Sequence, residues 1–89
     1  MKISIVIPVY NSSKILEVLV NEIKTNLKEF NDFEIILIND FSSDNSWEVI
    51  KKLKEKNIFL KGINLKKNYG QHSAIFCGLK YCSGDFIVC

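Results

Sequence analysis

The 89-residue sequence is poor in the residues that mark several common protein classes, with four glycines, one proline and one histidine. The turn P-V-Y-N-S-S at residues 8–13 has no glycine, so the G-x-G-x-x-G signature of dinucleotide binding is absent, and so is a P-loop. No Ser-His-Asp or Cys-His set can be assembled around His72. These absences argue against dinucleotide-dependent enzymes, P-loop NTPases and triad hydrolases.

Long apolar runs and a strong charge imbalance are also missing. No apolar stretch approaches the roughly 18 to 20 residues that cross a bilayer, and Met1-Lys2 followed by a strand-like run ending at Pro8 is a poor signal peptide. A net charge of +2 is too small to indicate nucleic-acid or membrane binding by bulk electrostatics. We expect a soluble, cytoplasmic chain with no nucleic-acid partner.

Cysteine is scarce and odd in number. Three thiols in a chain without a secretory signal indicate reduced cysteines rather than a disulfide framework. His72, Cys77 and Cys82 follow one another in steps of five, and each step rotates a helix position by about 140°. The three side chains therefore do not share one helix face, and we expect buried structural thiols rather than a metal site.

Apolar residues are abundant, at 47% against 25% charged, which is typical of a packed globular domain. Runs rich in β-branched residues alternate with segments of helical periodicity, and this alternation is typical of βαβ units with a parallel sheet. We interpret residues 1–89 as one α/β domain. The predicted strands are 3–9, 33–39, 59–65 and 85–89, and the predicted helices are 13–30, a segment from residue 43 or 44 to 56, and 71–81.

Local signals set the expected ends of these elements. Pro8 should end the first strand, because proline cannot donate to a central ladder. Asn11, Ser12 and Ser13 are candidate caps of the first helix, whose apolar stripe runs to Phe30, and Asn31-Asp32 makes the next turn. Ser43 or Asp44 should cap the second helix. The third helix is expected to bury the side that carries Ile75, Gly78, Leu79 and Cys82.

Two side chains stand out as candidate ligand-binding groups. Tyr10 and Asp40 each lie just past the carboxyl end of a predicted strand, where open α/β sheets bind their ligands. An aromatic ring next to a carboxylate suits a nucleobase, because the ring stacks on the base while the carboxylate accepts N–H bonds from its edge. Loop packing for Tyr10 and a turn or helix-start role for Asp40 are equally simple interpretations at this point.

Four segments in order give the chain a specific resemblance. S-I-V-I-P-V-Y-N, E-I-I-L-I-N-D-F-S-S-D-N-S, N-Y-G-Q-H-S-A-I-F-C-G-L and S-G-D-F-I-V-C resemble the N-terminal part of inverting family 2 glycosyltransferases of the GT-A fold. The third segment is most similar to the branch that transfers sugars to polyprenyl or dolichyl phosphate. The resemblance spans essentially all 89 residues. It implies a Rossmann-like three-layer α/β/α domain with a mostly parallel sheet in the strand order 3-2-1-4.

The resemblance also implies which residues bind the nucleotide of a UDP- or GDP-sugar donor. The P-x-Y-N turn and the second strand end would hold the base, the N-[FY]-G-Q loop would flank the donor, and a basic residue would lie near the phosphates. The matching positions are Pro8, Tyr10, Asn11, Ile38, Asp40, Lys66, Asn68, Gly70 and Gln71.

This sequence departs from the family pattern at several positions. Ser12 and Ser13 stand where the family commonly has acids, and Asn39, Asp40 and Phe41 stand where it has two acids and a glycine. The second acid is kept, whereas Phe41 in place of glycine should alter a turn that needs positive φ.

Features that the resemblance implies for a full-length enzyme are missing from residues 1–89. The Asp-x-Asp motif that holds Mg²⁺ or Mn²⁺ on the donor diphosphate and the acceptor-side half with the catalytic base would follow the last strand. We therefore expect a truncated nucleotide-binding part with no catalytic or metal-binding residue of its own and no activity alone. The full-length relative would act in cell-envelope glycan synthesis, associated with the cytoplasmic face of the membrane, with a polyprenyl phosphate or a growing glycan as acceptor.

Two alternatives differ in class. The first alternative is a non-catalytic nucleotide-binding module or an inactive truncated fragment. The second alternative is a receiver domain. The receiver domain is disfavoured because residues 58–65 contain no acidic phospho-acceptor. The last strand would leave an unpaired sheet edge, which favours self-association.

Overall fold

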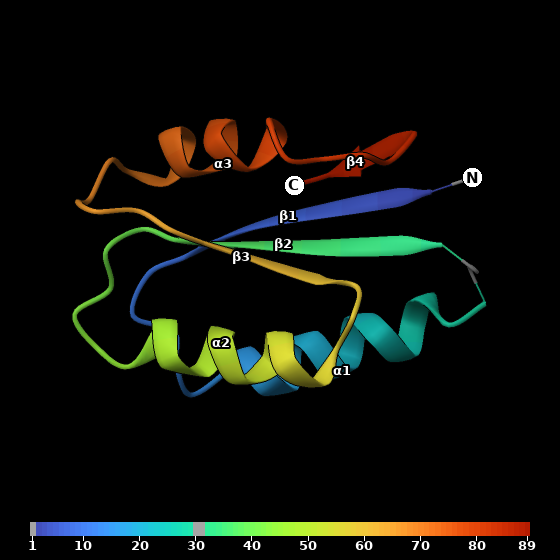
Figure 1. Ribbon diagram of the computed structural model, residues 1–89, viewed down its shortest axis with the longest axis horizontal. Coiled ribbons are helices and arrows are strands. Elements are labelled where there is room, and N and C mark those ends of the chain that lie inside the picture. Colours follow the sequence, from blue (N-terminus) through green and yellow to red (C-terminus); the bar gives the residue numbers. More distant parts are fainter. Residues whose placement is uncertain (1, 30–31) are drawn as a thin grey trace.

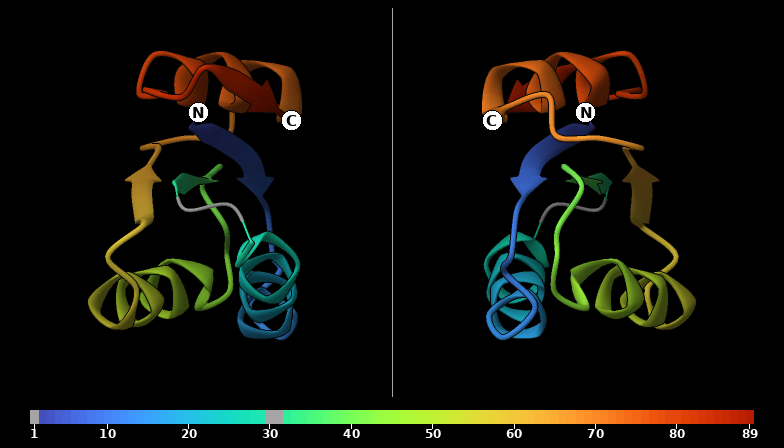
Figure 2. Two further views of the ribbon diagram at one scale, coloured as in Figure 1. Left: turned by 90° about the vertical axis from the view of Figure 1, so that its right-hand side faces the viewer. Right: turned by 90° about the vertical axis from the view of Figure 1, so that its left-hand side faces the viewer.

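The structure, a computed structural model, describes residues 2–29 and 32–89. Its strands and helices alternate along the chain, and the strands form a parallel sheet in the order β3-β2-β1-β4, as predicted. Helices α1 and α2 cover one face of the sheet and α3 covers the other, so the domain has three layers (Figures 1 and 2). The elements are β1 (Ile3–Val9), α1 (Leu16–Leu27), β2 (Phe33–Asn39), α2 (Ser46–Lys56), β3 (Leu60–Asn64), α3 (Gln71–Leu79) and β4 (Phe86–Val88).

The central pair of strands defines the end of the sheet at which a ligand would bind. β1 and β2 pair along their whole length, from Ile3 opposite Phe33 to Val9 opposite Asn39, whereas β4 pairs only with residues 3–5 of β1. β1 has the predicted bounds, 3–9, but it continues one residue past Pro8, which was expected to end it. Ile3 N and Val9 O bond towards β2, so the nitrogen of Pro8 faces the opposite side, which β4 does not reach. A proline is tolerated there because no ladder bond is lost.

Each face of the sheet has its own apolar core. On one face, side chains of β1, β2 and β3 pack against α1 and α2 around Leu16, Val20, Ile35, Leu37 and Ile50. On the other face, Val6, Ile36 and Ile38 pack against Ala74 of α3. Successive residues of β2 thus enter different cores, and six of its seven residues are buried. This explains why β2 reads as a continuous apolar run rather than an alternating one.

The helices are shorter than predicted, and the first one is not capped as expected. The helix predicted at 13–30 begins at Leu16 and ends at Leu27, and Phe30 and Asn31 lie outside the described residues. Its N-cap is Ile15, which makes no side-chain capping bond. Asn11, Ser12 and Ser13 are engaged with a different loop, described below. Asp44 does accept a bond from Ser46 N, the first residue of α2, at 2.9 Å.

The third helix matches its predicted buried side. Gly78 is buried, while Ile75, Leu79 and Cys82 pack half-buried against the core, and Ala74 adds a buried position that the prediction did not include. Helix α3 follows the sheet closely, because a Cβ added at Gly78 would lie 2.5 Å from Ile38 Cδ1 and 2.6 Å from Val6 Cγ1. A residue without a side chain is therefore required at this contact.

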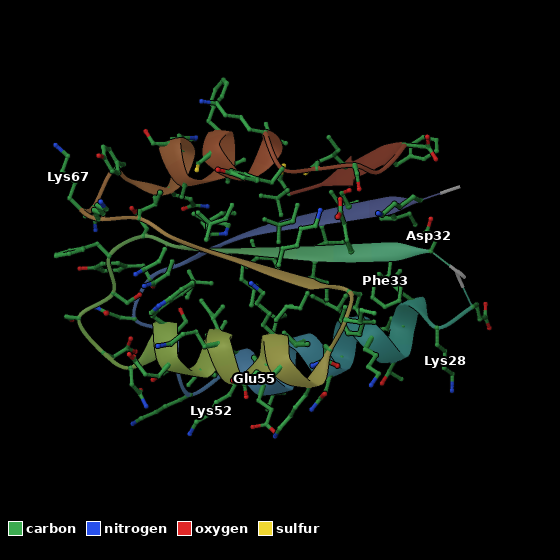
Figure 3. The ribbon with its side chains drawn as sticks, viewed as in Figure 1. Lys28, Asp32, Phe33, Lys52, Glu55 and Lys67 are labelled. Carbon is green, nitrogen blue, oxygen red and sulfur yellow. The ribbon has the colours of Figure 1, made fainter. Side chains whose placement is uncertain are left out.

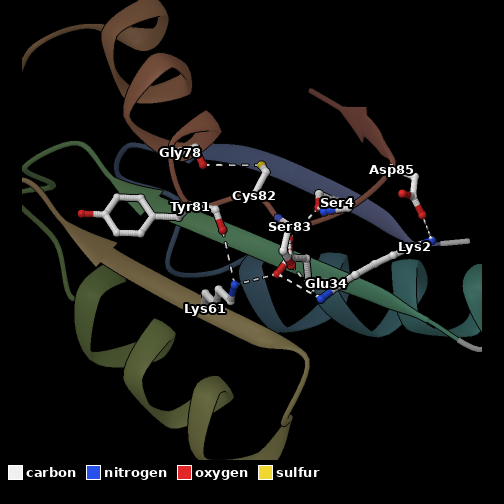
Figure 4. Close-up of polar contacts among 10 residues, drawn as sticks. Lys2, Ser4, Glu34, Lys61, Gly78, Tyr81, Cys82, Ser83 and Asp85 are labelled. Atoms are coloured by element: carbon white, nitrogen blue, oxygen red, sulfur yellow. Dashed lines mark hydrogen bonds and ion pairs between the residues drawn. The ribbon is translucent and has the colours of Figure 1, made fainter.

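A buried carboxylate joins the turn after α3 to the amino end of the sheet (Figure 4). Glu34 on β2 is only 2% exposed and pairs with Lys61 Nζ on β3 at 2.8 Å. Its other oxygen accepts bonds from Ser4 Oγ at 2.6 Å and from Ser83 N at 2.7 Å. Burial by itself raises the pKa of Glu34, but Lys61, Ser4 and Ser83 together lower it to about 2. The carboxylate therefore stays charged and fixes the approach to β4.

Cysteine burial differs in part from expectation. Cys77 and Cys82 are free thiols that are half-buried, and Cys89 is a free thiol exposed to solvent, so the prediction of buried thiols is wrong for Cys89. Burial raises the pKa of the Cys82 thiol. Among the helices within residues 2–29 and 32–89, none combines the length and the apolar character needed to cross a bilayer.

Candidate functional site

Three loops meet at the carboxyl ends of the central strands. We call residues 10–15 the first loop, residues 40–45 the second loop and residues 65–70 the third loop. Lys67 extends outward from the third loop, at the opposite end of the sheet from Asp32 (Figure 3). The loops enclose a cleft of about 420 Å³ lined by Pro8, Val9, Tyr10, Ser12, Asp40, Asn68, Gly70 and Gln71.

Asp40 is the charged group of this cleft and holds two of the loops together. It follows β2, is only 4% exposed, and its backbone N–H donates to Val9 O at 2.8 Å. Its Oδ1 accepts from Tyr69 N at 2.9 Å and its Oδ2 from Gly70 N at 3.0 Å. A carboxylate oxygen accepts more than one hydrogen bond. Asp40 therefore clamps the third loop and retains acceptor capacity for a ligand that carries N–H groups.

The other walls of the cleft offer a ring, amides and a helix end. Tyr10 is 53% exposed. Asn68 Oδ1 accepts from Gly70 N at 3.0 Å, and Gly70 has a φ of 90°, a conformation that favours glycine. Gln71 begins α3, so the positive end of that helix opens beside the cleft. Free N–H groups at a helix start favour an anionic group such as a phosphate.

The structure brings together six of the nine residues singled out from the sequence: Pro8, Tyr10, Asp40, Asn68, Gly70 and Gln71. Ile38 is fully buried in the core beneath α3 and does not line the cleft. Asn11 and Lys66 line two other hollows, one along the first loop and one beside Phe41 and Trp47. The nucleotide-binding role of all nine residues stays a prediction.

Sequence reasoning missed two cleft residues, Val9 and Ser12. Val9 was assigned to a buried strand and Ser12 to a helix cap. The signal that could have identified them is their position on either side of Tyr10 and Asn11, because an entire strand-to-helix turn, rather than one residue of it, faces the carboxyl end of a sheet.

The second loop contains one residue in a strained conformation and one acid with a low pKa. Phe41 has a φ of 56°, so it adopts the left-handed conformation that glycine would take freely. Hydrogen bonds from Ser46 and then Ser13 lower the pKa of the Asp44 carboxyl to about 2. Asp44 is therefore an anion that binds backbone N–H groups at any physiological pH.

The cleft residues do not fit a divalent cation. Among the lining residues Asp40 is the one carboxylate, so the cleft offers a single charged ligand. Within residues 2–29 and 32–89, no group of three or more His, Cys, Asp and Glu side chains is placed to hold a metal. Mg²⁺ or Mn²⁺ therefore stays a prediction for the longer relatives.

Comparison with known proteins identifies the family. The family model described as "Glycosyl transferase family 2" matches residues 4–89. The chain belongs to glycosyl transferase family 2. The resemblance noted in the sequence is thereby confirmed at the level of the family, whereas its polyprenyl-phosphate branch is not tested.

Solved structures of glycosyltransferases share the fold of this family 2 domain. TarS 1-349 from S. aureus in complex with UDP is 30% identical with a TM-score of 0.78, and the match covers 98% of this chain and 26% of TarS. TarS has also been solved in complex with UDP-GlcNAc, with a TM-score of 0.79. Mannosyltransferase PcManGT from Pyrobaculum calidifontis, in complex with GDP-Man and Mn²⁺, has a TM-score of 0.79 at 16% identity, which shows the fold alone.

The matched region is only part of these relatives. It covers 96% of this chain and 25% of PcManGT, and the figures for TarS are similar. The chain therefore spans about a quarter of the length of the solved structures it matches.

Proposed function

We propose that this domain binds the nucleotide of a UDP- or GDP-sugar in the cleft and forms the donor side of an inverting glycosyltransferase. The observation that carries the proposal is the pairing of an exposed aromatic ring, Tyr10, with a buried carboxylate, Asp40, in one cleft at the carboxyl ends of β1 and β2. Family membership and the nucleotides bound to TarS and PcManGT support it.

Different cleft residues bind different parts of the donor. The Tyr10 ring stacks on the base, and Asp40 accepts an N–H from the edge of the base, a group that both uracil and guanine carry. Asn68, Gln71 and the start of α3 face the diphosphate, where amide and backbone N–H groups bind phosphate oxygens. The transfer itself forms a bond from an acceptor oxygen to the sugar carbon and breaks the bond from that carbon to the diphosphate, with inversion.

The acceptor and the setting of the reaction belong to the same proposal. A polyprenyl phosphate or a growing glycan would supply the attacking oxygen, in cell-envelope glycan synthesis at the cytoplasmic face of the membrane. The complex of S. aureus TarS with UDP-GlcNAc supports a role in bacterial glycan synthesis. Lys66 remains a candidate for the phosphates, although its side chain lines the hollow beside Phe41.

Nucleotide titration of the ¹⁵N-labelled chain tests the proposal. UDP or GDP should shift the backbone signals of Tyr10, Asp40 and Gly70. Asp40→Asn should weaken binding at least about tenfold, because a hydrogen bond to a charged group contributes about 1.5 to 3 kcal/mol. Asp85→Asn is the matched control, because Asp85 binds Lys2 N at the opposite end of the sheet.

A second pair of variants separates the ring from the fold. Tyr10→Ala should weaken nucleotide binding by about 1 to 3 kcal/mol, which is the range for base stacking on an aromatic side chain, whereas Tyr10→Phe should bind almost as wild type. Absence of any shift at millimolar nucleotide would contradict the proposal, and so would equal binding by Tyr10→Ala and Tyr10→Phe.

The alternative is a nucleotide-binding module without catalytic activity. We propose that the 89-residue chain alone does not transfer sugar, because the cleft supplies no candidate base or metal ligand set. Incubation with UDP- or GDP-sugar, Mn²⁺ and a polyprenyl phosphate should release no nucleotide above the rate of hydrolysis. Metal-dependent transfer by this chain would refute its inactivity and leave the nucleotide proposal intact.

A further inference from the structure

The first and second loops are joined by two side chains that cross in opposite directions. Asn11 Oδ1, on the first loop, accepts bonds from Ser43 N at 2.8 Å and from Asp44 N at 3.3 Å. Asp44, on the second loop, accepts a bond from Ser13 N at 3.2 Å through Oδ2, while its Oδ1 accepts from Ser46 N. Each loop thus supplies the acceptor for backbone N–H groups of the other.

The backbone of the first loop is held at three successive residues. Asn11 N donates to Ser42 Oγ at 3.0 Å, Ser12 N to Ser46 Oγ at 3.0 Å, and Ser13 N to Asp44. These donors would otherwise need water or a cap of their own, because α1 begins only at Leu16 and has no side-chain cap. The polar residues expected to cap α1 therefore connect two loops instead.

The network continues to the third loop. Ser42 Oγ, which accepts from Asn11 N, donates to Asn39 Oδ1, and Asn39 Nδ2 donates to Asn64 Oδ1 at 2.8 Å, at the end of β3. Asp40 then holds the third loop through Tyr69 N and Gly70 N. All three loops that line the cleft are therefore linked by hydrogen bonds before any ligand binds.

The network holds the backbone of the residues that follow Tyr10. The Tyr10 ring is half exposed, so the backbone of the first loop sets the direction of the side chain. The next residue, Asn11, has a φ of 49°, a left-handed conformation that asparagine tolerates better than most residues. This conformation places Tyr10 on the cleft wall while the Asn11 amide reaches the second loop, away from the cleft.

We propose that Asn11 and Asp44 are positioning residues of the nucleotide site, which act through Tyr10 and do not touch the nucleotide. The inference rests on the proposed nucleotide function and changes the role of Asn11 from a ligand contact to a support. Fixing the loop in advance lowers the conformational entropy lost on binding, and this raises affinity without adding a contact.

Affinity measurements on three variants test the inference. Asn11→Gly keeps the left-handed backbone and removes the amide, Asp44→Ala removes the carboxylate, and Asn45→Ala is the control, because Asn45 lies in the same loop and makes no side-chain capping bond. UDP and GDP should bind about tenfold more weakly to the first two variants. Binding to Asn45→Ala should stay within about twofold of wild type.

A double-variant cycle distinguishes positioning from a general loss of stability. If Asn11 acts through Tyr10, Asn11→Gly should have almost no further effect on affinity in a Tyr10→Ala background. A purely structural residue would instead lower the free energy of unfolding and leave the affinity of the folded protein unchanged. Full additivity of the two variants, or unchanged affinity in Asn11→Gly and Asp44→Ala, would overturn the inference.

The ordering of the loop is measured separately without nucleotide. The ¹H–¹⁵N NOE at Tyr10 and amide exchange at Ser12 and Ser13 should report greater mobility in Asn11→Gly and Asp44→Ala than in Asn45→Ala. If wild type binds neither UDP nor GDP, the proposed function fails, and the NOE at Tyr10 alone decides on positioning. An unchanged NOE would then refute it, and a reduced NOE would support Tyr10 positioning for a different ligand.

Discussion

At the scale of single residues, side-chain chemistry explains features that a hydrophobic pattern does not contain. Glu34 is an acid at the second position of an otherwise largely apolar strand, and it is kept charged inside the protein by Lys61, Ser4 and Ser83. Phe41 occupies a left-handed position, a conformation that favours glycine. Both residues lead to measurable effects on stability.

Glu34 should make folding sensitive to acid. Its pKa in the folded protein is about 2, below the ordinary value of 4.5, so its contribution is fully present above about pH 5 and is lost as the pH falls through 2. That difference corresponds to about 3 kcal/mol at neutral pH. Urea unfolding of Glu34→Gln should show a deficit of about this size at pH 7 that falls below about 1 kcal/mol at pH 2.

The comparison with wild type at each pH removes the contribution of Asp44, because both proteins keep that residue and its low pKa. A deficit in Glu34→Gln that stays constant from pH 7 to pH 2 would show that Glu34 acts through packing rather than charge.

Glycine at position 41 should make the folded protein more stable than another residue without a ring. The left-handed conformation costs an ordinary residue about 1 to 2 kcal/mol, part of which glycine gives back through its greater freedom in the unfolded chain. Phe41→Gly and Phe41→Ala both remove the ring, so their difference isolates the backbone. We expect Phe41→Gly to unfold at a higher urea concentration than Phe41→Ala, with an unchanged m-value. The difference in the free energy of unfolding should be about 1 kcal/mol. An alanine variant of equal or greater stability would contradict this explanation.

At the scale of elements, the sequence pattern predicted every strand and helix, and the bounds of β1 (3–9) and β2 (33–39) are confirmed, whereas the helices are shorter than predicted. The helix predicted at 13–30 starts three residues late because Asn11, Ser12 and Ser13 bond to the second loop and to the first residue of α2 rather than to their own helix. Pro8 lies inside β1 because β4 is too short to reach it. Both errors arise from partners in other elements, which a local pattern does not contain.

The close contact between α3 and the sheet should not tolerate a methyl group. Gly78→Ala gains helix propensity of about 1 kcal/mol, but its Cβ would overlap Ile38 and Val6, and overpacking of this kind costs about 1 to 3 kcal/mol. We expect a net loss of stability in urea unfolding and shifted signals of Asn68 and Gly70, which precede α3. Ser73→Ala, on the exposed side of the same helix, is the control and should be neutral or slightly stabilising.

At the scale of the whole molecule, the sheet has an open edge. Phe86, Ile87 and Val88 of β4 are all exposed, and β4 lies at the end of the strand order. Unpaired edges of this kind favour pairing with another chain. The self-association predicted from the sequence stays a prediction. Sugar transfer likewise stays a proposal, because this chain spans only about a quarter of TarS 1-349 and of PcManGT.

Sedimentation velocity over a range of concentrations tests self-association. Wild type should sediment as a mixture that shifts to larger species with concentration, and Ile87→Lys should remain monomeric because a charge on an edge strand blocks pairing. Ile58→Lys carries the same change at a fully exposed position in the turn before β3 and should behave as wild type. A monomeric wild type would refute the prediction.

The sequence by itself determined the α/β class, the parallel strand order with its family, and the position of Tyr10 and Asp40 at strand ends. These depend on period, composition and short motifs, which are local along the chain. Only the tertiary structure decided that Asn11 and Asp44 bind each other's loops, that Lys66 lies outside the cleft and that Glu34 is ion-paired. The loop contacts and the ion pair depend on which donors and acceptors lie within about 3 Å of one another. These partners are some 30 positions apart in the sequence, so no local pattern predicts their pairing.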